Sequence, residues 1–93
     1  MKNNDGSFHG SADVDSRTLK YMSLYFDLCS EEYHLWRTGV VPQYIWTLWK
    51  DGMRITMRKE IYRHSWAALK QNYYTEFSSF FEHEVIGISN QPH

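Results

Sequence analysis

Residues 15–42, DSRTLKYMSLYFDLCSEEYHLWRTGVVP, decide the fold of this chain. Apolar side chains recur there at alternating spacings of three and four, the period of one helix face; they are Leu19, Met22, Phe26, Cys29, Tyr33 and Trp36. Asp15 or Ser16 suits the cap at the start of this helix. Gly39 suits the left-handed position that follows a helix, and Pro42 suits the first turn of the next one. The spacing therefore predicts a long helix joined by a tight turn to a second, antiparallel helix.

Apolar residues also lie on the opposite side of this predicted helix. On a helical wheel of about 100° per residue, Leu24, Leu28 and Leu35 lie opposite Phe26, and Tyr21 lies beside them. Soluble monomers usually avoid a long, contiguous exposed apolar strip, and a symmetric dimer would bury the strip against its own copy. We therefore predict a homodimer whose interface contains Tyr21, Leu24, Leu28 and Leu35.

Three shorter helices are predicted after the turn. The second helix covers about residues 42–51 with Gly52 as its expected end, and a kinked continuation through residues 53–57 is left open. The third covers about residues 58–72, and a last short helix follows Thr75 as its cap. The side chains expected to face inward are Ile45, Leu48 and Trp49, then Tyr62, Trp66, Leu69 and Tyr73, and finally Phe77, Phe80, Phe81 and Val85. No strand-type alternation persists, so the predicted fold class is all-α, a small bundle of about four helices with a long first helix.

Length and composition predict a single domain. Residues 15–88 are the expected helical domain, residues 1–14 are a polar stretch expected to be a disordered tail, and residues 89–93 form a short C-terminal tail. Cys29 is the only cysteine in the 93 residues. Neither an intrachain disulfide nor a multi-cysteine zinc site can therefore be built. Oligomerisation is the expected source of added stability for so small a chain.

Residues 29–34 bring together a thiol, carboxylates and an imidazole. Cys29 lies on the inward face, whereas His34 lies roughly 140° away around the helix, too far for a cysteine–histidine catalytic pair. We interpret Cys29 as a buried structural thiol. Glu31 and His34 have the Glu-x-x-His spacing of ferritin-like metal sites, but both lie on the polar side and no second such motif occurs. They are the candidates of a metal-binding alternative.

The main interpretation assigns no catalytic residue, no metal and no cofactor. The sequence contains no Gly-rich phosphate loop and no G-x-S-x-G motif. We therefore expect a protein that is not an enzyme.

Positive charge is concentrated between residues 50 and 70, although the formal net charge of the chain is −1. Arg54, Arg58, Lys59 and Arg63 are candidate contacts for a nucleic acid or another anion, with aromatic residues nearby. Typical nucleic-acid-binding modules are basic overall. The main interpretation of this segment is therefore a solvated helix face that complements acidic helices.

The sequence predicts a cytoplasmic location. No apolar run approaches the roughly 18 residues of a membrane span. Residues 1–17 have neither the basic start nor the apolar core of a signal peptide.

The segment YFDLCSEEYHLWRTGVVPQYIWTLWKDGM (residues 25–53), followed by a Trp-containing helix and YYTEFSSFFE (residues 73–82), resembles an uncharacterised family of small helical bacterial proteins. In that family an aromatic-x-x-Leu-Cys-x-Glu-Glu segment precedes a Gly turn and a Trp-x-x-Trp helix. The resemblance covers about residues 19–85. A membrane segment often precedes the helical part in such proteins, and no such segment occurs in these residues. The resemblance implies a helical fold and transfers no activity.

The sequence is therefore best interpreted as a non-enzymatic helical protein–protein interaction module. It would act as a self-associating scaffold or adaptor, or as a small regulatory inhibitor. Nucleic-acid binding through residues 50–70 is the alternative, and metal binding in a helical bundle is the second alternative.

Overall fold

The computed structural model describes residues 15–87 of the chain. These residues form helices alone, so the predicted all-α fold with a long first helix is confirmed. The elements are α1 (Ser16–Arg37), α2 (Gln43–Thr56), α3 (Glu60–Leu69), a 3₁₀ turn η1 (Lys70–Asn72), α4 (Thr75–Phe80) and a π-helical turn η2 (Phe81–Ile86). The predicted tails, residues 1–14 and 89–93, lie outside the described residues.

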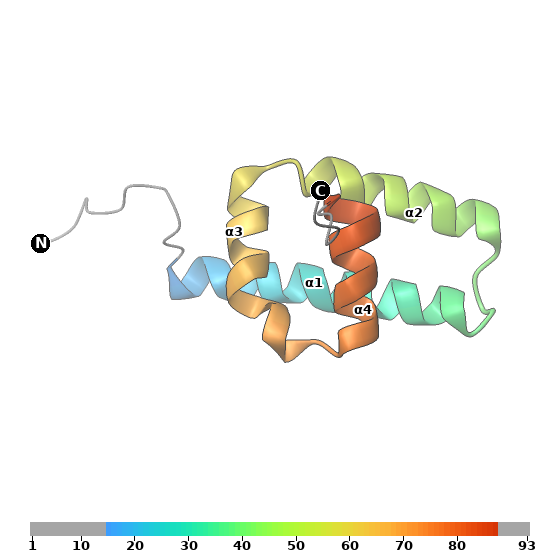
Figure 1. Ribbon diagram of the computed structural model, residues 1–93, viewed down its shortest axis with the longest axis horizontal. Coiled ribbons are helices and arrows are strands. Elements are labelled where there is room, and N and C mark those ends of the chain that lie inside the picture. Colours follow the sequence, from blue (N-terminus) through green and yellow to red (C-terminus); the bar gives the residue numbers. More distant parts are fainter. Residues whose placement is uncertain (1–14, 88–93) are drawn as a thin grey trace, which may run out of the picture.

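Helix α1 begins and ends at the signals that its sequence contains. The Asp15 carboxylate accepts a 2.8 Å hydrogen bond from a backbone N–H of the first turn and caps the helix. At the other end Gly39 has a φ of 81°. The backbone N–H groups of Gly39 and of the next residue donate to carbonyls of the last turn. This is the Schellman arrangement, in which a left-handed glycine ends a helix, and α2 returns antiparallel to α1 as predicted (Figure 1).

Helix α2 continues through Gly52, so the expected end at this glycine is wrong and the continuation left open by the sequence is correct. A glycine inside a helix costs about 1 kcal/mol relative to alanine. The longer helix offsets this cost because it carries Met53 and Met57 into the core, where they are 3% and 2% exposed. The inward face of α2 is consequently built on Trp46 and Met53. Leu48, expected to face inward on the shorter helix, is 64% exposed.

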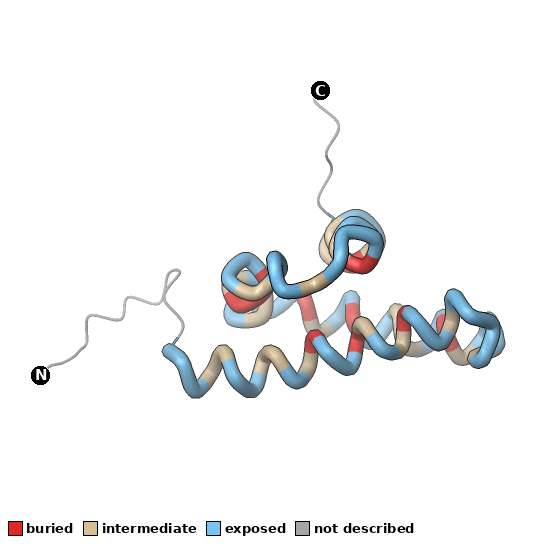
Figure 2. The backbone as a smooth tube through the Cα atoms, turned by 90° about the horizontal axis from the view of Figure 1, so that it is seen from below, coloured by how far each residue is buried: buried red, intermediate tan, exposed pale blue. Residues whose placement is uncertain are grey.

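The helices form two layers. α1 and α2 lie side by side in one layer, and α3 and α4 cross them on one face (Figure 1). α3 contacts α1, and η2 contacts α2. Figure 2 shows the buried residues between the layers and exposed residues along the underside of the α1–α2 layer. The second layer therefore covers one face of the α1–α2 pair, and no described element covers the other face.

Aromatic rings fill the space between the layers. Phe26 of α1 is fully buried and makes edge-to-face contacts with Trp66 of α3 and Phe81 of η2, with ring centroids 5.2 and 5.8 Å apart. Near the α1–α2 turn, the rings of Trp36 and Trp46 stack, with a centroid distance of 4.9 Å and an angle of 8° between the ring planes. Such pairs contribute about 0.5–1.5 kcal/mol each beyond the area that they bury. The core thus ties α1 to every other α-helical region of the fold.

The polar ends of three core aromatic side chains reach carboxylates. The donors and acceptors are Trp66 with Glu82 (3.1 Å), Tyr33 with Glu76 (3.1 Å) and Tyr73 with Asp27 (2.8 Å). Burial raises the pKa of both tyrosine hydroxyls, so they remain protonated donors. Lys70 and Arg37 pair with two of these carboxylates, Glu82 at 2.6 Å and Glu76 at 3.2 Å. The N–H and O–H groups of these three aromatic side chains therefore all have hydrogen-bond acceptors.

None of the helices between residues 15 and 87 combines the length and apolarity that a membrane span requires. α1 is long enough, at 22 residues. It carries charged side chains along its length, however, and these are costly in a bilayer.

Glu82 couples stability to pH. Partial burial favours its neutral form, but the hydrogen bonds from Lys70 and Trp66 outweigh burial and hold the pKa of Glu82 below its ordinary value of 4.5. A folded-state pKa below the unfolded one means that the carboxylate contributes stability above the unfolded pKa. This contribution is lost as the pH falls through the folded pKa.

Glu82→Ala should lower the free energy of unfolding at pH 7 by about 1–3 kcal/mol, because the buried indole N–H of Trp66 loses its acceptor. Urea unfolding followed by tryptophan fluorescence measures the loss, with Glu84→Ala on the exposed side of η2 as the control. The difference between Glu82→Ala and wild type should shrink as the pH falls below 4.5, the ordinary pKa. Equal effects of the two substitutions would contradict this role.

Candidate functional site

The face of the α1–α2 pair that points away from α3 and α4 is apolar, and no other part of residues 15–87 covers it. α1 contributes the four side chains that the sequence assigned to an interface, and all four are exposed. α2 adds three that the sequence analysis missed. We call these seven residues the open face: Tyr21, Leu24, Leu28 and Leu35 of α1 with Tyr44, Leu48 and Ile55 of α2. The pairing of this face with a partner stays a prediction.

A shallow groove joins the two halves of the open face. Leu28 and Leu48 border it, and the buried side chains of Cys29 and Met53 form its floor. Its volume is about 280 Å³. A Cβ atom on Gly52 would meet no protein atom within 4 Å. The glycine inside α2 therefore leaves open space in the groove.

The missed residues of α2 follow from its true length. Tyr44 and Ile55 lie four and seven residues from Leu48, so the three share one side of the helix. Trp46, Met53 and Met57 lie on the other side and are buried. Extending the helical period through Gly52 is the signal that assigns Leu48 to the outer side.

Three titratable side chains line the groove, Tyr25, Cys29 and Glu32, and burial pushes all three toward their neutral forms. Partial burial raises the pKa of the Glu32 carboxyl. Burial raises the pKa of the Cys29 thiol to about 12, and this side chain is 1% exposed. A thiol that stays protonated at neutral pH is a poor nucleophile. Cys29 is thus a buried packing residue, as the sequence indicated.

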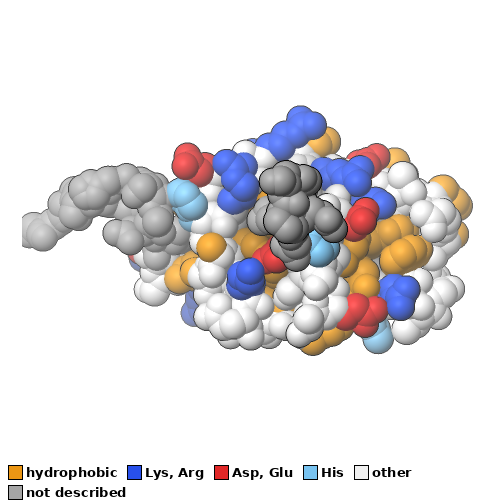
Figure 3. Space-filling model, in the orientation of Figure 1, with side chains coloured by type: hydrophobic (Ala, Val, Ile, Leu, Met, Phe, Trp, Pro, Cys, Tyr) orange, Lys and Arg blue, Asp and Glu red, His pale blue; other side chains and the backbone are white. Residues whose placement is uncertain are grey.

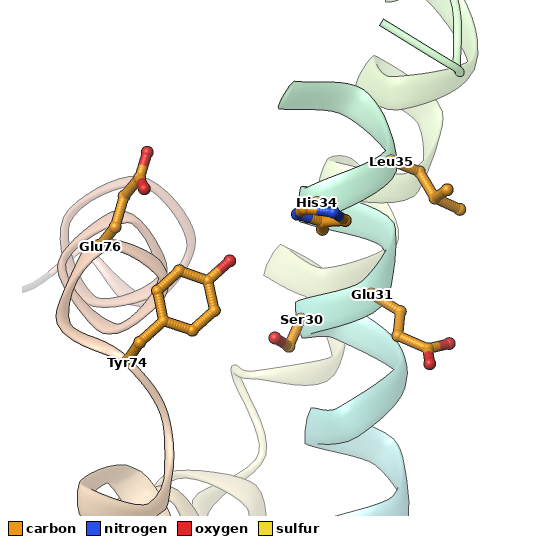
Figure 4. A pocket seen from close by; sticks show the side chains of 6 residues that line it. All are labelled: Ser30, Glu31, His34, Leu35, Tyr74 and Glu76. Carbon is orange, nitrogen blue, oxygen red and sulfur yellow. The ribbon is translucent and has the colours of Figure 1, made fainter. Parts of the chain in front are cut away.

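A second hollow, of about 720 Å³, lies between α1 and the start of α4 (Figure 4). Its lining residues are Ser30, Glu31, His34, Leu35, Tyr74 and Glu76. Figure 4 shows His34 and Tyr74 pointing toward each other across the hollow. Glu31 and Leu35 extend from the opposite side of α1.

The metal candidates Glu31 and His34 do not converge in this hollow. The nearby Glu76 carboxylate is already engaged by the Tyr33 hydroxyl and the Arg37 guanidinium. Between residues 15 and 87 no group of three or more His, Cys, Asp or Glu side chains is arranged to hold a metal ion. The geometry therefore gives the metal-binding alternative no support.

Two of the four basic candidates have contacts within the chain. Arg54 donates from Nε to the carbonyl of Glu84 at 2.8 Å and thereby joins α2 to η2. Arg63 donates from Nη1 to the carbonyl of Met57, at 3.1 Å, and to that of the next residue. Lysine and arginine side chains often satisfy carbonyls at a helix C-terminus. Arg63 in this way closes the end of α2.

The other two candidates, Arg58 and Lys59, are exposed in the turn between α2 and α3. Figure 3 shows Lys and Arg side chains along the upper part of the molecule with acidic side chains among them. A surface of mixed sign attracts phosphate groups less strongly than a uniformly basic one. The structure thus leaves Arg58 and Lys59 as the exposed members of the nucleic-acid alternative.

No family model, curated protein or solved structure matches this chain. The resemblance to small helical bacterial proteins accordingly stays a prediction.

Arg63→Ala should lower the free energy of unfolding by about 1 kcal/mol, because carbonyls at the end of α2 lose a charged donor. Lys59→Ala, in the same turn, should change it by no more than about 0.5 kcal/mol, as is usual for a surface substitution. Urea titrations followed by circular dichroism compare the two. A Lys59→Ala loss as large as that of Arg63→Ala would contradict the helix-closing role.

Cys29 in the folded protein should resist a water-soluble thiol reagent at pH 8, because its thiol is buried and neutral. The same reagent should modify it completely in denaturing urea, which serves as the control. Rapid labelling of the native protein would show that the groove opens to solvent.

Proposed function

We propose that this protein is a non-enzymatic helical interaction module that associates with a second copy of itself through the open face. The observation that carries the proposal is the apolar surface of the α1–α2 pair that the rest of the described chain leaves uncovered. Leu24, Leu48 and Ile55 are 63%, 64% and 58% exposed in the single chain. Complete burial of one such side chain is worth about 1.5–3 kcal/mol. A partner that covers this face recovers part of that free energy.

The shape of the face favours a second copy as the partner. Two rows of exposed side chains run along two antiparallel helices, with a groove between them. A two-fold interface brings the same patch of both subunits together, so one self-complementary surface is sufficient. The pairing also supplies the added stability that a domain of this size usually obtains from disulfides, metals or oligomerisation.

Face-to-face pairing leaves the second layer of each copy on the outside. The hollow between α1 and α4 lies beside the pairing surface, because Leu35 belongs to both. A dimer would therefore display two copies of α3, α4 and their connections. This duplication suits a scaffold or adaptor that holds two partner molecules, or a small inhibitor that binds a two-fold target.

Leu28→Glu should convert a wild-type dimer into a monomer, because carboxylates would be buried in the interface without partners. Leu28 is exposed in the single chain, so the helical content should not change. Val40→Glu is the control, since Val40 is 66% exposed in the α1–α2 turn. Sedimentation velocity measures the mass, and circular dichroism checks the fold.

Wild type should sediment as a dimer at about 100 µM, where mass action favours association. A wild-type monomer at that concentration would overturn the proposal. Dissociation caused equally by Val40→Glu would show that another surface mediates association.

A further inference from the structure

The open side of α1 has the spacing of a helix-pairing seam. Exposed residues recur there at intervals of four, three, four, three and four. We call this row the α1 seam: Arg17, Tyr21, Leu24, Leu28, Glu31 and Leu35. A repeat of 3.5 residues keeps one stripe in contact with a second helix over several turns. The seam therefore fits a helix as its occupant.

Charge is separated along the open side of this helix. Arg17 and Lys20 lie in its N-terminal part, whereas Glu31 and Glu32 lie in its C-terminal half. None of the four forms an ion pair with another residue of the described part of the chain. Arg17 occupies the first turn, where a positive charge opposes the helix dipole. These four charges of α1 thus lack ion-pair partners among the described residues.

Three helix pairings are possible on the open face, and charge distinguishes them. Parallel α1 helices would place Arg17 against Arg17 and Glu31 against Glu31. Stacking α1 on α2 of the second copy would bring Glu31 and Glu32 toward Asp51, because Glu32 lies level with Gly52 along the groove. Antiparallel α1 helices place the basic part of each helix against the acidic part of the other. Like charges in contact weaken an interface, whereas opposite charges favour it.

We propose that a second copy of this chain binds the open face with its α1 antiparallel to the first, and that the two-fold axis passes between Leu24 and Leu28. The inference rests on the proposed function and specifies the orientation and register of the two copies. In this register each seam residue meets a seam residue of the other copy. The pairs are Leu24 with Leu28, Tyr21 with Glu31, and Arg17 with Leu35.

Glu31 sets the register. It is the acidic residue within the seam, and it lies opposite Tyr21 and beside Lys20 of the second copy. The tyrosine hydroxyl and the lysine ammonium both donate to its carboxylate, which meets the requirement that a buried charge be paired. Single polar residues in an apolar seam specify register in coiled coils. Shifting the helices by one heptad, so that Leu24 meets Leu35, would leave Glu31 against Leu28.

Charge reversal tests this arrangement in the full chain. Lys20→Glu and Glu31→Lys should each weaken the dimer by about tenfold or more, because each places like charges together twice across the two-fold axis. The double variant, Lys20→Glu with Glu31→Lys, should restore the dimer to within a few-fold of wild type. Both residues are exposed in the single chain. The reversals place a negative charge nearer the N-terminus of α1 and a positive charge nearer its C-terminus, which the helix dipole favours. The fold should therefore persist.

Sedimentation velocity over a concentration series measures dimer affinity for wild type and the three variants. Lys59→Glu, away from the open face, is the matched control and should leave the affinity unchanged. If wild type is dimeric and Leu28→Glu is monomeric but the reversals have no effect, the antiparallel register is wrong and the proposed function stands. Weakening by both single reversals without recovery in the double variant also overturns the register. A wild-type monomer overturns both.

Discussion

The contact of Phe26 with Trp66 and Phe81 joins the two layers of this fold, and the other elements depend on it. Phe26 has no exposed surface. The ring centroids of its two neighbours, Trp66 and Phe81, lie 4.8 Å apart. A chain with four Trp, seven Tyr and five Phe in 93 residues obtains much of its stability from such large rings. Trp and Tyr each carry a polar group, an indole N–H or a hydroxyl, that needs a hydrogen-bond partner when the ring is buried. This requirement explains the positions of Glu82, Glu76 and Asp27 at the edge of the core.

The same arrangement determines which surface stays uncovered. Two short crossing helices cover one face of the α1–α2 pair, and the chain contributes no further described element to the other. α1 and α2 are apolar on both faces, since Phe26 and Trp46 point inward while Leu28 and Leu48 point outward. An additional layer of helices is therefore what the open face requires. In the proposed dimer, α1 of the second copy contributes to that layer.

Local chemistry predicted the ends of α1, because Asp15 and Gly39 act on their own turns. The prediction that α2 ends at Gly52 is wrong, because a glycine inside a helix costs only about 1 kcal/mol. Burying the side chains of Met53 and Met57 stabilises the longer helix by more than this cost. That error displaced Leu48 to the wrong side of α2. The roles of long basic side chains depend on which carbonyls fold close to them. The hollow between α1 and α4 likewise depends on the crossing of the two layers, which no local spacing specifies.

Unpaired charge and uncovered apolar surface coincide on α1. In residues 50–70 much of the positive charge is used within the chain: Arg54 joins α2 to η2, Arg63 closes α2, and Lys70 pairs with Glu82. The concentration of basic residues there is therefore explained largely by folding. Along the α1 seam, by contrast, Arg17 and Glu31 have no ion-pair partner in the described residues and border leucines that lack cover. Two independent physical criteria thus select the same helix as the surface for the proposed dimer.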